Sequence, residues 1–465
     1  MRKKTELWIL MGILVFAFFL RVYALGNAPL WIDESTSAMA SRQIVEKGIP
    51  RFDSGLLYSR AYSFHYLQAF FILFSQSEFS ARFVSVIFGM LTIVLAYFIG
   101  KEYSKKGGLI AALFFAVFYL EVFYSRQARF YQMFQFFFFL SLYLLYKSKK
   151  DIRWIYPALI SFFITLDIQI EGLILSPFFI VYIIAYTKEK WLSIFPLIPL
   201  VKKFMPAVGL STKSTEVAVN YASEYFSKIS NMAYVLLLSV FGVVWAFIKN
   251  KKLTILMVAP AIITLIGVFS LQTFALRYSY FFVFPVVLYS SLLFSFLYEK
   301  FGKIMLVPIF ILLILPSNLI FPHTYTNVII PISYNLNDLS APETNYKVIP
   351  QDLMAELKNP HNTVISLFSS NVEWYIKKPN YVIPFTMNGI GEDQISMINS
   401  NNKTVDRYSG AEILNYSNLP AKPYYVLGDF FSASKLKPEQ RENFENLTSN
   451  CTEKYASDDL VIWKC

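Results

Sequence analysis

Residues 7–25 read LWILMGILVFAFFLRVYAL, and this apolar stretch decides the fold of the chain. It is interrupted by Gly12 and, near its end, by Arg21, and at about 20 residues it is long enough to cross ~30 Å of hydrocarbon. Its length, and the lack of an Ala-x-Ala-like site after it, favour an uncleaved transmembrane helix over a signal peptide. Residues 2–4 are all basic, and basic residues beside a first helix usually stay in the cytoplasm. The loop directly after this helix is therefore expected on the external side of the membrane.

The composition agrees with a polytopic α-helical membrane protein. Of the 465 residues, 55% are hydrophobic, 18% aromatic and only 16% charged, which is more apolar than an ordinary soluble protein. The 46 Phe and 31 Tyr suit lipid-facing helices with interfacial rings. The formal charge of +11 comes from short basic clusters between apolar runs. Such clusters indicate loops at an anionic leaflet rather than nucleic-acid binding.

Apolar runs alternate with polar loops, and their order predicts the topology. Basic clusters at residues 101–106, 147–153 and 249–252 mark the cytoplasmic face, so the N-terminus is expected inside and the C-terminus outside. The run 191–201 is short for a span, at about 11 residues, but the parity of the topology needs it. About 11 transmembrane spans are expected, at residues 7–25, 83–100, 109–124, 132–146, 154–166, 172–186, 191–201, 229–248, 253–271, 278–297 and 304–321.

Two domains are expected, a transmembrane domain over residues 1–321 and a soluble α/β domain over residues 322–465. The first external loop, residues 26–80, contains two amphipathic segments at 34–47 and 62–74, which predict interfacial helices. From residue 322 polar residues become common, and short apolar strands alternate with helical segments. Strands are expected at 363–368, 381–384, 424–427, 453–457 and 460–464, and helices at 351–358 and 438–447.

The only two cysteines, Cys451 and Cys465, bracket the last two expected strands. A disulfide between them is favoured in an oxidising exterior, and two free thiols are the alternative. Four Asn-x-Ser/Thr sequons in the same domain agree with an external location.

The acidic pair in Leu30-Trp31-Ile32-Asp33-Glu34, just beyond the first span, is the first candidate for chemistry. Asp33 could act as a general base, and a solvated helix start with acids near the dipole is the other interpretation. The chain has only three His, and no Gly-rich phosphate loop, His/Cys metal cluster or nucleophile elbow. A soluble-type hydrolase or zinc enzyme is therefore disfavoured. No cofactor is indicated, and a divalent cation stays open.

Several arginines are expected at the external face, where they could bind a phosphate through paired N–H donors. For Arg126 and Arg129 the alternative is interfacial snorkelling. Arg277 lies between two apolar runs, and its alternative is a turn arginine that touches headgroups. Tyr131 and Tyr278 also have an alternative, as belt aromatics. Glu121 and Glu171 lie near helix ends, where they could be solvated caps. The four candidate arginines are Arg60, Arg126, Arg129 and Arg277.

Three motifs together resemble those of the membrane glycosyltransferases of the C superfamily. They are residues 29–34 (PLWIDE) after Arg21, residues 125–131 (SRQARFY) after the third span, and Arg277-Tyr278 with Pro285 seven residues after Tyr278. Within the superfamily they resemble the protein O-mannosyltransferase and aminoarabinose-transferase group, and the C-terminal part of the chain looks like the small external domain of its prokaryotic members. The resemblance covers roughly residues 7–321.

The resemblance implies an integral membrane, inverting glycosyltransferase with a polyprenyl-phosphate sugar donor and an external active site. Its acceptor is expected to be a protein hydroxyl, a lipid or a glycan. Asp33 corresponds to the catalytic acidic residue of the first loop, and Glu34 is taken with it. Gln127 departs from the family, because many relatives carry Glu there. The residues expected to bind donor phosphate or substrate are Arg60, His65, Arg126, Arg129, Tyr131, Arg277 and Tyr278.

The alternative function is that of a transporter or flippase for an anionic lipid or solute. A transporter is expected to place ionisable residues inside the membrane and often shows inverted repeats. The charged residues of this chain are expected at one external face, and its sequence shows no internal repeat. The transferase is therefore the favoured function.

Overall fold

The computed structural model describes residues 3–186, 188–199, 223, 233–269, 276–305, 307, 344–383, 396–398, 403–429, 433 and 436–465. The chain divides into two compact units. We call Met1–Tyr23 with Phe83–Tyr334 the helical unit, and Ala24–Arg82 with Asn335–Cys465 the α/β unit. The first loop thus belongs to the same unit as the C-terminal part of the chain. The expected domain boundary at residues 321 and 322 lies outside the described residues and stays a prediction.

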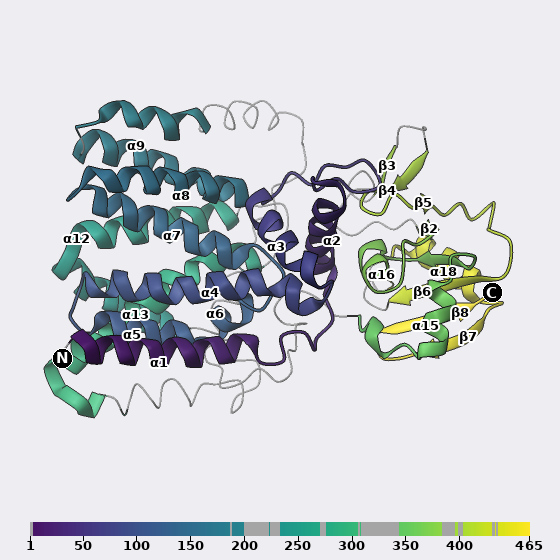
Figure 1. Cartoon of the computed structure of the whole chain (residues 1–465), viewed down its shortest axis with the longest axis horizontal. Coiled ribbons are helices and arrows are strands. Elements are labelled where there is room, and N and C mark those ends of the chain that lie inside the picture. The colour runs from purple at the N-terminus through teal and green to yellow at the C-terminus, as the bar shows by residue number, and fades with distance from the viewer. Residues whose placement is uncertain are drawn as a thin grey trace. The chain divides into compact units, whose positions relative to one another are not determined.

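Long apolar helices run beside one another in the helical unit (Figure 1). Within the described residues, four stretches are long and apolar enough to cross a membrane: Lys4–Val22, Glu78–Lys101, Val235–Phe269 and Arg277–Met305. The helices are α1 (Lys3–Val22), α4 (Glu78–Lys101), α5 (Gly107–Val117), α6 (Tyr119–Tyr124), α7 (Tyr131–Ser148), α8 (Ile155–Ile168), α9 (Leu175–Tyr186), α12 (Ala233–Phe269) and α13 (Val283–Phe301).

Most expected spans correspond to these helices, with two differences in detail. The third span is broken at Phe118, whose extended backbone (φ −64°, ψ 129°) separates α5 from α6. The eighth and ninth spans are the two halves of α12, which kinks at Asn250 (φ −149°, ψ 74°). Parts of the seventh and last spans lie outside the described residues, so the total of 11 spans stays a prediction.

Glycine allows a close approach between α12 and α13. A Cβ atom at Gly242 would lie only 1.8 Å from the carbonyl oxygen of Tyr289. No residue with a side chain fits at this position. Small residues have this use at many helix contacts in membranes, because they let two backbones approach.

Within the described residues, the α/β unit contains a mixed sheet of eight strands in the order β3-β4-β5-β2-β1-β6-β8-β7. The central strands β5, β2, β1 and β6 are parallel, and the outer strands are antiparallel. The strands are β1 (Thr363–Ser366), β2 (Tyr381–Val382), β3 (Ser396–Ile398), β4 (Thr404–Asp406), β5 (Glu412–Ile413), β6 (Tyr424–Asp429), β7 (Thr452–Ala456) and β8 (Leu460–Lys464).

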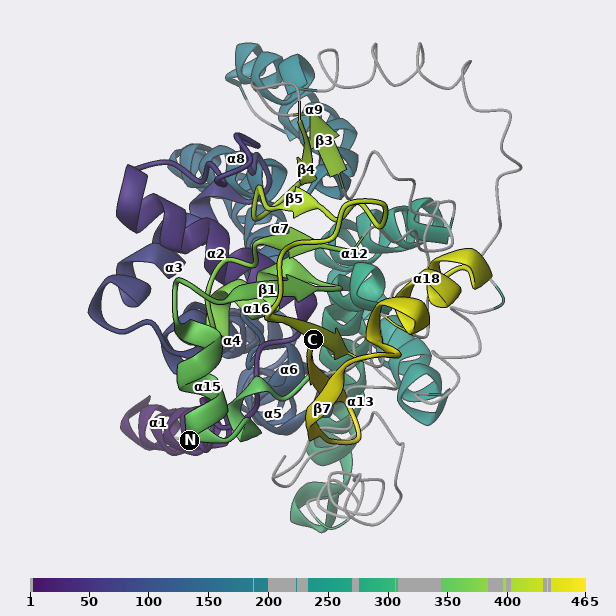
Figure 2. The ribbon, with the colours of Figure 1, turned by 90° about the vertical axis from the view of Figure 1, so that its right-hand side faces the viewer.

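Helices cover both faces of the sheet because neighbouring strand residues point to opposite sides. On β1, Val364 packs towards α15 (Gln351–Lys358) and α16 (Ser369–Tyr375), whereas Ile365 packs towards α18 (Pro438–Thr448). Figure 2 shows α15 and α18 on opposite sides of the strands. The α/β character expected for this part of the chain is confirmed.

The same unit contains the two helices expected in the first loop, α2 (Ile32–Lys47) and α3 (Tyr62–Phe74). The side chain of Glu34 accepts the Trp31 N–H and caps the start of α2, and Gly48 (φ 77°) ends the helix in the left-handed conformation that glycine tolerates. Cys451 and Cys465 form a disulfide between the end of α18 and the end of β8.

Candidate functional site

The acidic pair lies in the first turn of α2, and its two members have different surroundings. Glu34 is only 1% exposed, whereas Asp33 is partly exposed. Successive residues of a helix point about 100° apart, so one carboxylate can face inward while its neighbour stays accessible. Asp33 is thus the member of the pair that a substrate can approach.

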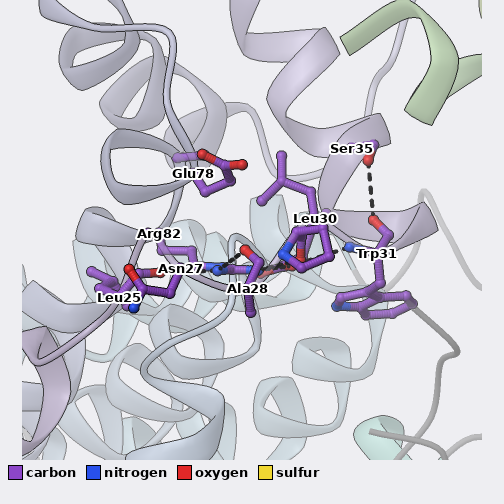
Figure 3. Close-up of polar contacts among 12 residues, drawn as sticks. Leu25, Asn27, Ala28, Leu30, Trp31, Ser35, Glu78 and Arg82 are labelled. Carbon is purple, nitrogen blue, oxygen red and sulfur yellow. Dashed lines mark hydrogen bonds and ion pairs between the residues drawn. The ribbon is translucent and has the colours of Figure 1, made fainter. Parts of the chain in front are cut away.

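Arg82, in the second turn of α4, binds Glu34 and the chain that leads into α2. Figure 3 shows the side chain of Arg82 beside Leu25 and Ala28 of that chain segment. Arg82 Nε and Nη2 donate to the two carboxylate oxygens of Glu34 at 3.0 and 2.7 Å. Its Nη1 donates to the carbonyl oxygens of Leu25 and Ala28 at 2.9 and 2.8 Å, and Nη2 donates to that of Pro29 at 2.8 Å. These contacts correspond to the five N–H donors of a guanidinium.

Aromatic side chains lie near Asp33. Burial raises the pKa of Tyr408 to about 12, with smaller contributions from Tyr58 and from the charge of Asp33. The ring of Phe52 meets those of Tyr58 and Tyr408 edge-on, with centroids 5.7 and 5.5 Å apart. Tyr58 and Tyr408 are partly exposed, so the surroundings of the carboxylate are aromatic without being closed.

The other two expected site residues of the α/β unit differ in exposure. Arg60 is exposed, just before α3. His65 is fully buried, with Nδ1 3.3 Å from Ser41 Oγ and its ring against that of Tyr58 at 5.2 Å. These surroundings are typical of a packed core histidine.

In the helical unit, Arg126 holds the end of α1. Its Nη1 donates to the carbonyl oxygens of Leu20, Arg21 and Tyr23 at 3.0, 3.2 and 2.6 Å. These carbonyls belong to the last turn of the helix and to the residue just after it. The helix dipole also favours a cation at this end. Arg126 is buried, and the contacts described for it are structural.

Arg129 and Arg277 each lie against aromatic rings. The guanidinium carbon of Arg129 is 4.5 Å from the ring centroid of Phe130 and 5.4 Å from that of Tyr131, and Nη2 donates to the Tyr131 hydroxyl at 3.3 Å. That of Arg277 is 5.4 Å from the centroid of Tyr278, in the 3-10 helix η5 (Leu276–Phe282). Arg277 and Tyr278 are partly exposed, whereas Arg129 and Tyr131 are buried.

The interpretation of Glu121 as a solvated cap is wrong. The side chain is 1% exposed, and its carboxylate accepts from Gln135 Nε2 at 2.9 Å, from Gln132 Nε2 at 3.4 Å and from the Tyr280 hydroxyl at 3.0 Å. The apolar run around it hid this role, because its partners come from other helices.

Arg21 explains the break in the third span. The extended backbone at Phe118 interrupts the helical hydrogen bonds, and buried carbonyls need another donor. Nη1 and Nη2 of Arg21 donate to the carbonyl oxygens of Ala116 and Phe115, both at 2.9 Å. Arg21 is fully buried and stabilises the end of α5.

The expected site residues fall into two groups, one in each unit. Within the described parts of the chain, no three His, Cys, Asp or Glu side chains gather into a metal-binding group. The α/β unit contains Asp33, Glu34, Arg60 and His65, and the helical unit contains Arg126, Arg129, Tyr131, Arg277 and Tyr278.

Arg82 was not among the expected site residues, although the sequence contains a signal for it. An arginine early in an otherwise apolar helix of 24 residues is costly unless it is paired. Possible partners in the preceding loop were the acidic pair, Glu46 and Asp53, besides Glu78 one turn before Arg82 in the same helix. No comparable signal marked Tyr375, whose hydroxyl accepts the N–H of Leu30 at 2.6 Å.

The fold of this chain is similar to that of two proteins of known structure. ArnT from Cupriavidus metallidurans in the apo state aligns with 100% of this chain and 98% of its own, with a TM-score of 0.63 and 9% identity. The same protein bound to undecaprenyl phosphate gives a TM-score of 0.57, 11% identity and coverage of 99% and 98%. A third structure is AglB, the oligosaccharyltransferase of Archaeoglobus fulgidus, in complex with an inhibitory peptide and a dolichol-phosphate. It aligns with 100% of this chain and 74% of its own, with a TM-score of 0.56 and 13% identity. Together with the four described stretches that are long and apolar enough to cross a membrane, this fold indicates a multi-pass membrane protein.

Residues 61–208 match the family described as Dolichyl-phosphate-mannose-protein mannosyltransferase. No curated protein matches the chain. The family match begins next to α3, so the acidic pair lies outside the matched residues and its role must be argued from its own geometry.

Proposed function

We propose that this protein transfers a sugar from a polyprenyl-phosphate donor to an acceptor on the extracytoplasmic face of the membrane. The observation that carries the proposal is the difference within the acidic pair: Glu34 is buried in its ion pair with Arg82, whereas Asp33 is partly exposed. The fold supports the donor class, because relatives with this fold were obtained with undecaprenyl phosphate and with dolichol-phosphate.

Asp33 acts as the general base in this proposal. An acceptor hydroxyl gives its proton to the carboxylate while its oxygen bonds to the anomeric carbon of the sugar. The bond from that carbon to the phosphate oxygen breaks on the opposite face, so the configuration inverts and polyprenyl phosphate leaves. Arg129 and Arg277 are proposed to bind the phosphate, whose charge grows as it leaves. Glu34 is a positioning residue.

Release of polyprenyl phosphate tests this function. Membranes containing the full chain are given labelled dolichyl-phosphate mannose and a panel of undecaprenyl-phosphate sugars, with membranes of the producing organism as the source of acceptor. Asp33→Asn keeps the size of the side chain but not its basicity, and it should lower turnover about 10²–10⁴-fold. Asp352→Asn is the matched control, because Asp352 is exposed in the first turn of α15 in the same unit.

Near-normal turnover of Asp33→Asn at saturating donor and acceptor would contradict the assignment of the base. No release from any donor, with membranes in which the wild-type protein is folded, would contradict the transferase itself.

A transporter or flippase for an anionic lipid stays the second candidate. The observation that favours it is the buried carboxylate of Glu121 with its partners Gln132, Gln135 and Tyr280. Ionisable residues inside a membrane protein often mark a transport path. A flippase would move a fluorescent polyprenyl-phosphate sugar across proteoliposomes and leave its sugar–phosphate bond intact. A transferase would break that bond, so product analysis separates the two classes.

A further inference from the structure

Both polar main-chain groups of Leu30 are bound by side chains of α16. The Leu30 N–H donates to the hydroxyl of Tyr375 at 2.6 Å, and Asn371 Nδ2 donates to the Leu30 carbonyl oxygen at 3.2 Å. Leu30 immediately precedes Trp31, the N-cap of α2, and lies three residues before Asp33. The segment that leads into α2 is therefore held by residues that lie 345 and 341 positions after Leu30 in the sequence.

The Tyr375 hydroxyl uses both of its hydrogen-bonding capacities. It accepts from Leu30 and donates to Glu78 Oε1 at 3.2 Å. The ring stacks on that of Tyr346, with centroids 5.8 Å apart and planes 13° apart. A hydroxyl can donate and accept at once, and phenylalanine at this position would fill the same space without doing either.

Contacts between α16 and α2 continue beyond the first turn. Thr36 Oγ1 donates to Ser370 Oγ at 3.4 Å, and Arg42 Nη2 donates to Glu373 Oε1 at 2.7 Å. Figures 1 and 2 both show α16 beside α2. The contacts span several turns of α2, so they fix its axis as well as its first residue.

The other face of α16 is anchored in the sheet. Val372 and the following Ile376 belong to the core cluster that includes Val364 of β1 and Leu427 of β6. A helix packed on a sheet cannot shift without opening that core, since interiors are close-packed. α16 therefore connects a rigid sheet to the start of α2.

We propose that α16 is a positioning element for Asp33, and that Tyr375 and Asn371 are its positioning residues. The inference rests on the proposed role of Asp33 as the base. It gives the C-terminal part of the chain a share in turnover, because small displacements of a reacting group can cost up to about 10²-fold in rate. Donor binding should depend on α16 much less.

Tyr375→Phe is the first test, measured with whichever of the donors above is turned over. We expect kcat to fall about ten- to hundredfold while the KM for donor changes less than about twofold. Tyr425→Phe is the matched control, because Tyr425 is also buried in this unit and its hydroxyl bonds Glu356, away from α2. An unchanged kcat for Tyr375→Phe, or an equal loss in both variants, overturns the proposal.

A double variant tests whether Tyr375 acts through Asp33. In the Asp33→Asn background, Tyr375→Phe should have little further effect, because the group that it positions has already lost its function. Two losses that multiply fully would show independent roles and would overturn the proposal. If Asp33→Asn alone keeps its turnover, the proposed function fails at the base. If it loses turnover and Tyr375→Phe does not, only this inference fails.

Hydrogen exchange gives a readout that needs no substrate. In the full-length protein in detergent, Tyr375→Phe should speed exchange in the peptide that contains residues 30–35 and leave a peptide from α3 unchanged. Tyr425→Phe should alter neither peptide. Unchanged exchange at residues 30–35 in Tyr375→Phe would overturn the proposal.

Discussion

The guanidinium of Arg82 and the carboxylate of Glu34 form a two-point ion pair, with N–O distances of 3.0 and 2.7 Å. Both side chains are nearly enclosed, at 6% and 1% exposed. The same guanidinium binds three carbonyl oxygens in the chain between α1 and α2. The ion pair thus holds the first loop just before Asp33. The side chains of α16 hold Leu30, in the same segment, from the C-terminal part of the chain.

Arg82→Ala is predicted to destabilise the protein strongly. Removing one partner of a buried pair leaves the other charge uncompensated, at a cost of about 3–5 kcal/mol. Thermal unfolding in detergent should show a clear fall in Tm, and Arg82→Lys should recover only part of it, because an ammonium lacks the planar fork. Arg153→Ala is the control, since Arg153 is 85% exposed in its pair with Asp151 and its loss should leave Tm almost unchanged. Similar small changes in Tm for both variants would contradict the prediction.

Arg129 and Arg126 are predicted to respond differently to substitution. A charge-assisted contact with phosphate is worth about 1.5–3 kcal/mol, so Arg129→Ala should raise the apparent KM for donor well over tenfold if the contact exists in the ground state. Arg129→Lys should restore part of the affinity. Arg126→Ala should mainly lower Tm, because Arg126 binds three carbonyl oxygens around the end of α1. Unchanged donor kinetics in a folded Arg129→Ala protein would favour the snorkelling alternative.

Orientation in the membrane is predicted from the basic clusters. A tag inserted at Asn250, in the kink between the halves of α12, should be protected from external reagents in intact cells. A tag after Cys465 should be accessible, because the C-terminal part is predicted outside. Labelling with a membrane-impermeant reagent, before and after permeabilisation, measures both. Finding the two tags on the same side would contradict the topology and the external active site.

The elements of this chain could be predicted where a local pattern specifies them. The helix at residues 351–358 was expected at the bounds that α15 has, because apolar residues recur at helical spacing after Pro350. The break at Phe118 could not be predicted, because the apolar run continues through it and the donors that satisfy it come from Arg21. The spacing of apolar residues predicts which face of a helix is buried. It does not predict which distant side chain completes the hydrogen bonds of that helix.

The candidate site shows the same division. The acidic pair could be found from its position after the first span, and the resemblance already assigned the base to Asp33. The different surroundings of Asp33 and Glu34 could not be predicted, because Arg82 lies 48 residues beyond the carboxylate that it binds. The contact between Leu30 and Tyr375 joins two ordinary residue types across 345 positions, and no spacing rule applies to it.

Glu373, which joins α16 to α2 through Arg42, is predicted to make stability depend on pH. Burial raises the pKa of Glu373 from its ordinary value of 4.5 to about 7, although Arg42 opposes the shift. Between about pH 4.5 and 7 the folded state therefore binds more protons at this position than the unfolded state, so its contribution to the free energy of unfolding falls as pH rises through that window. Glu373→Gln cannot titrate, so the Tm of the wild type should gain on that of the variant as the pH is lowered from about 7 to about 4.5.

Glu356→Gln is the control for this prediction. Its hydrogen bond with Tyr425 holds the pKa of Glu356 below the ordinary value, so this carboxylate is ionised in both states above about pH 5. The Tm difference between the wild type and Glu356→Gln should therefore stay constant from about pH 5 to 7. Parallel curves of Tm against pH for the wild type and Glu373→Gln would show that the Glu373 carboxylate titrates alike in both states, and the prediction would be wrong.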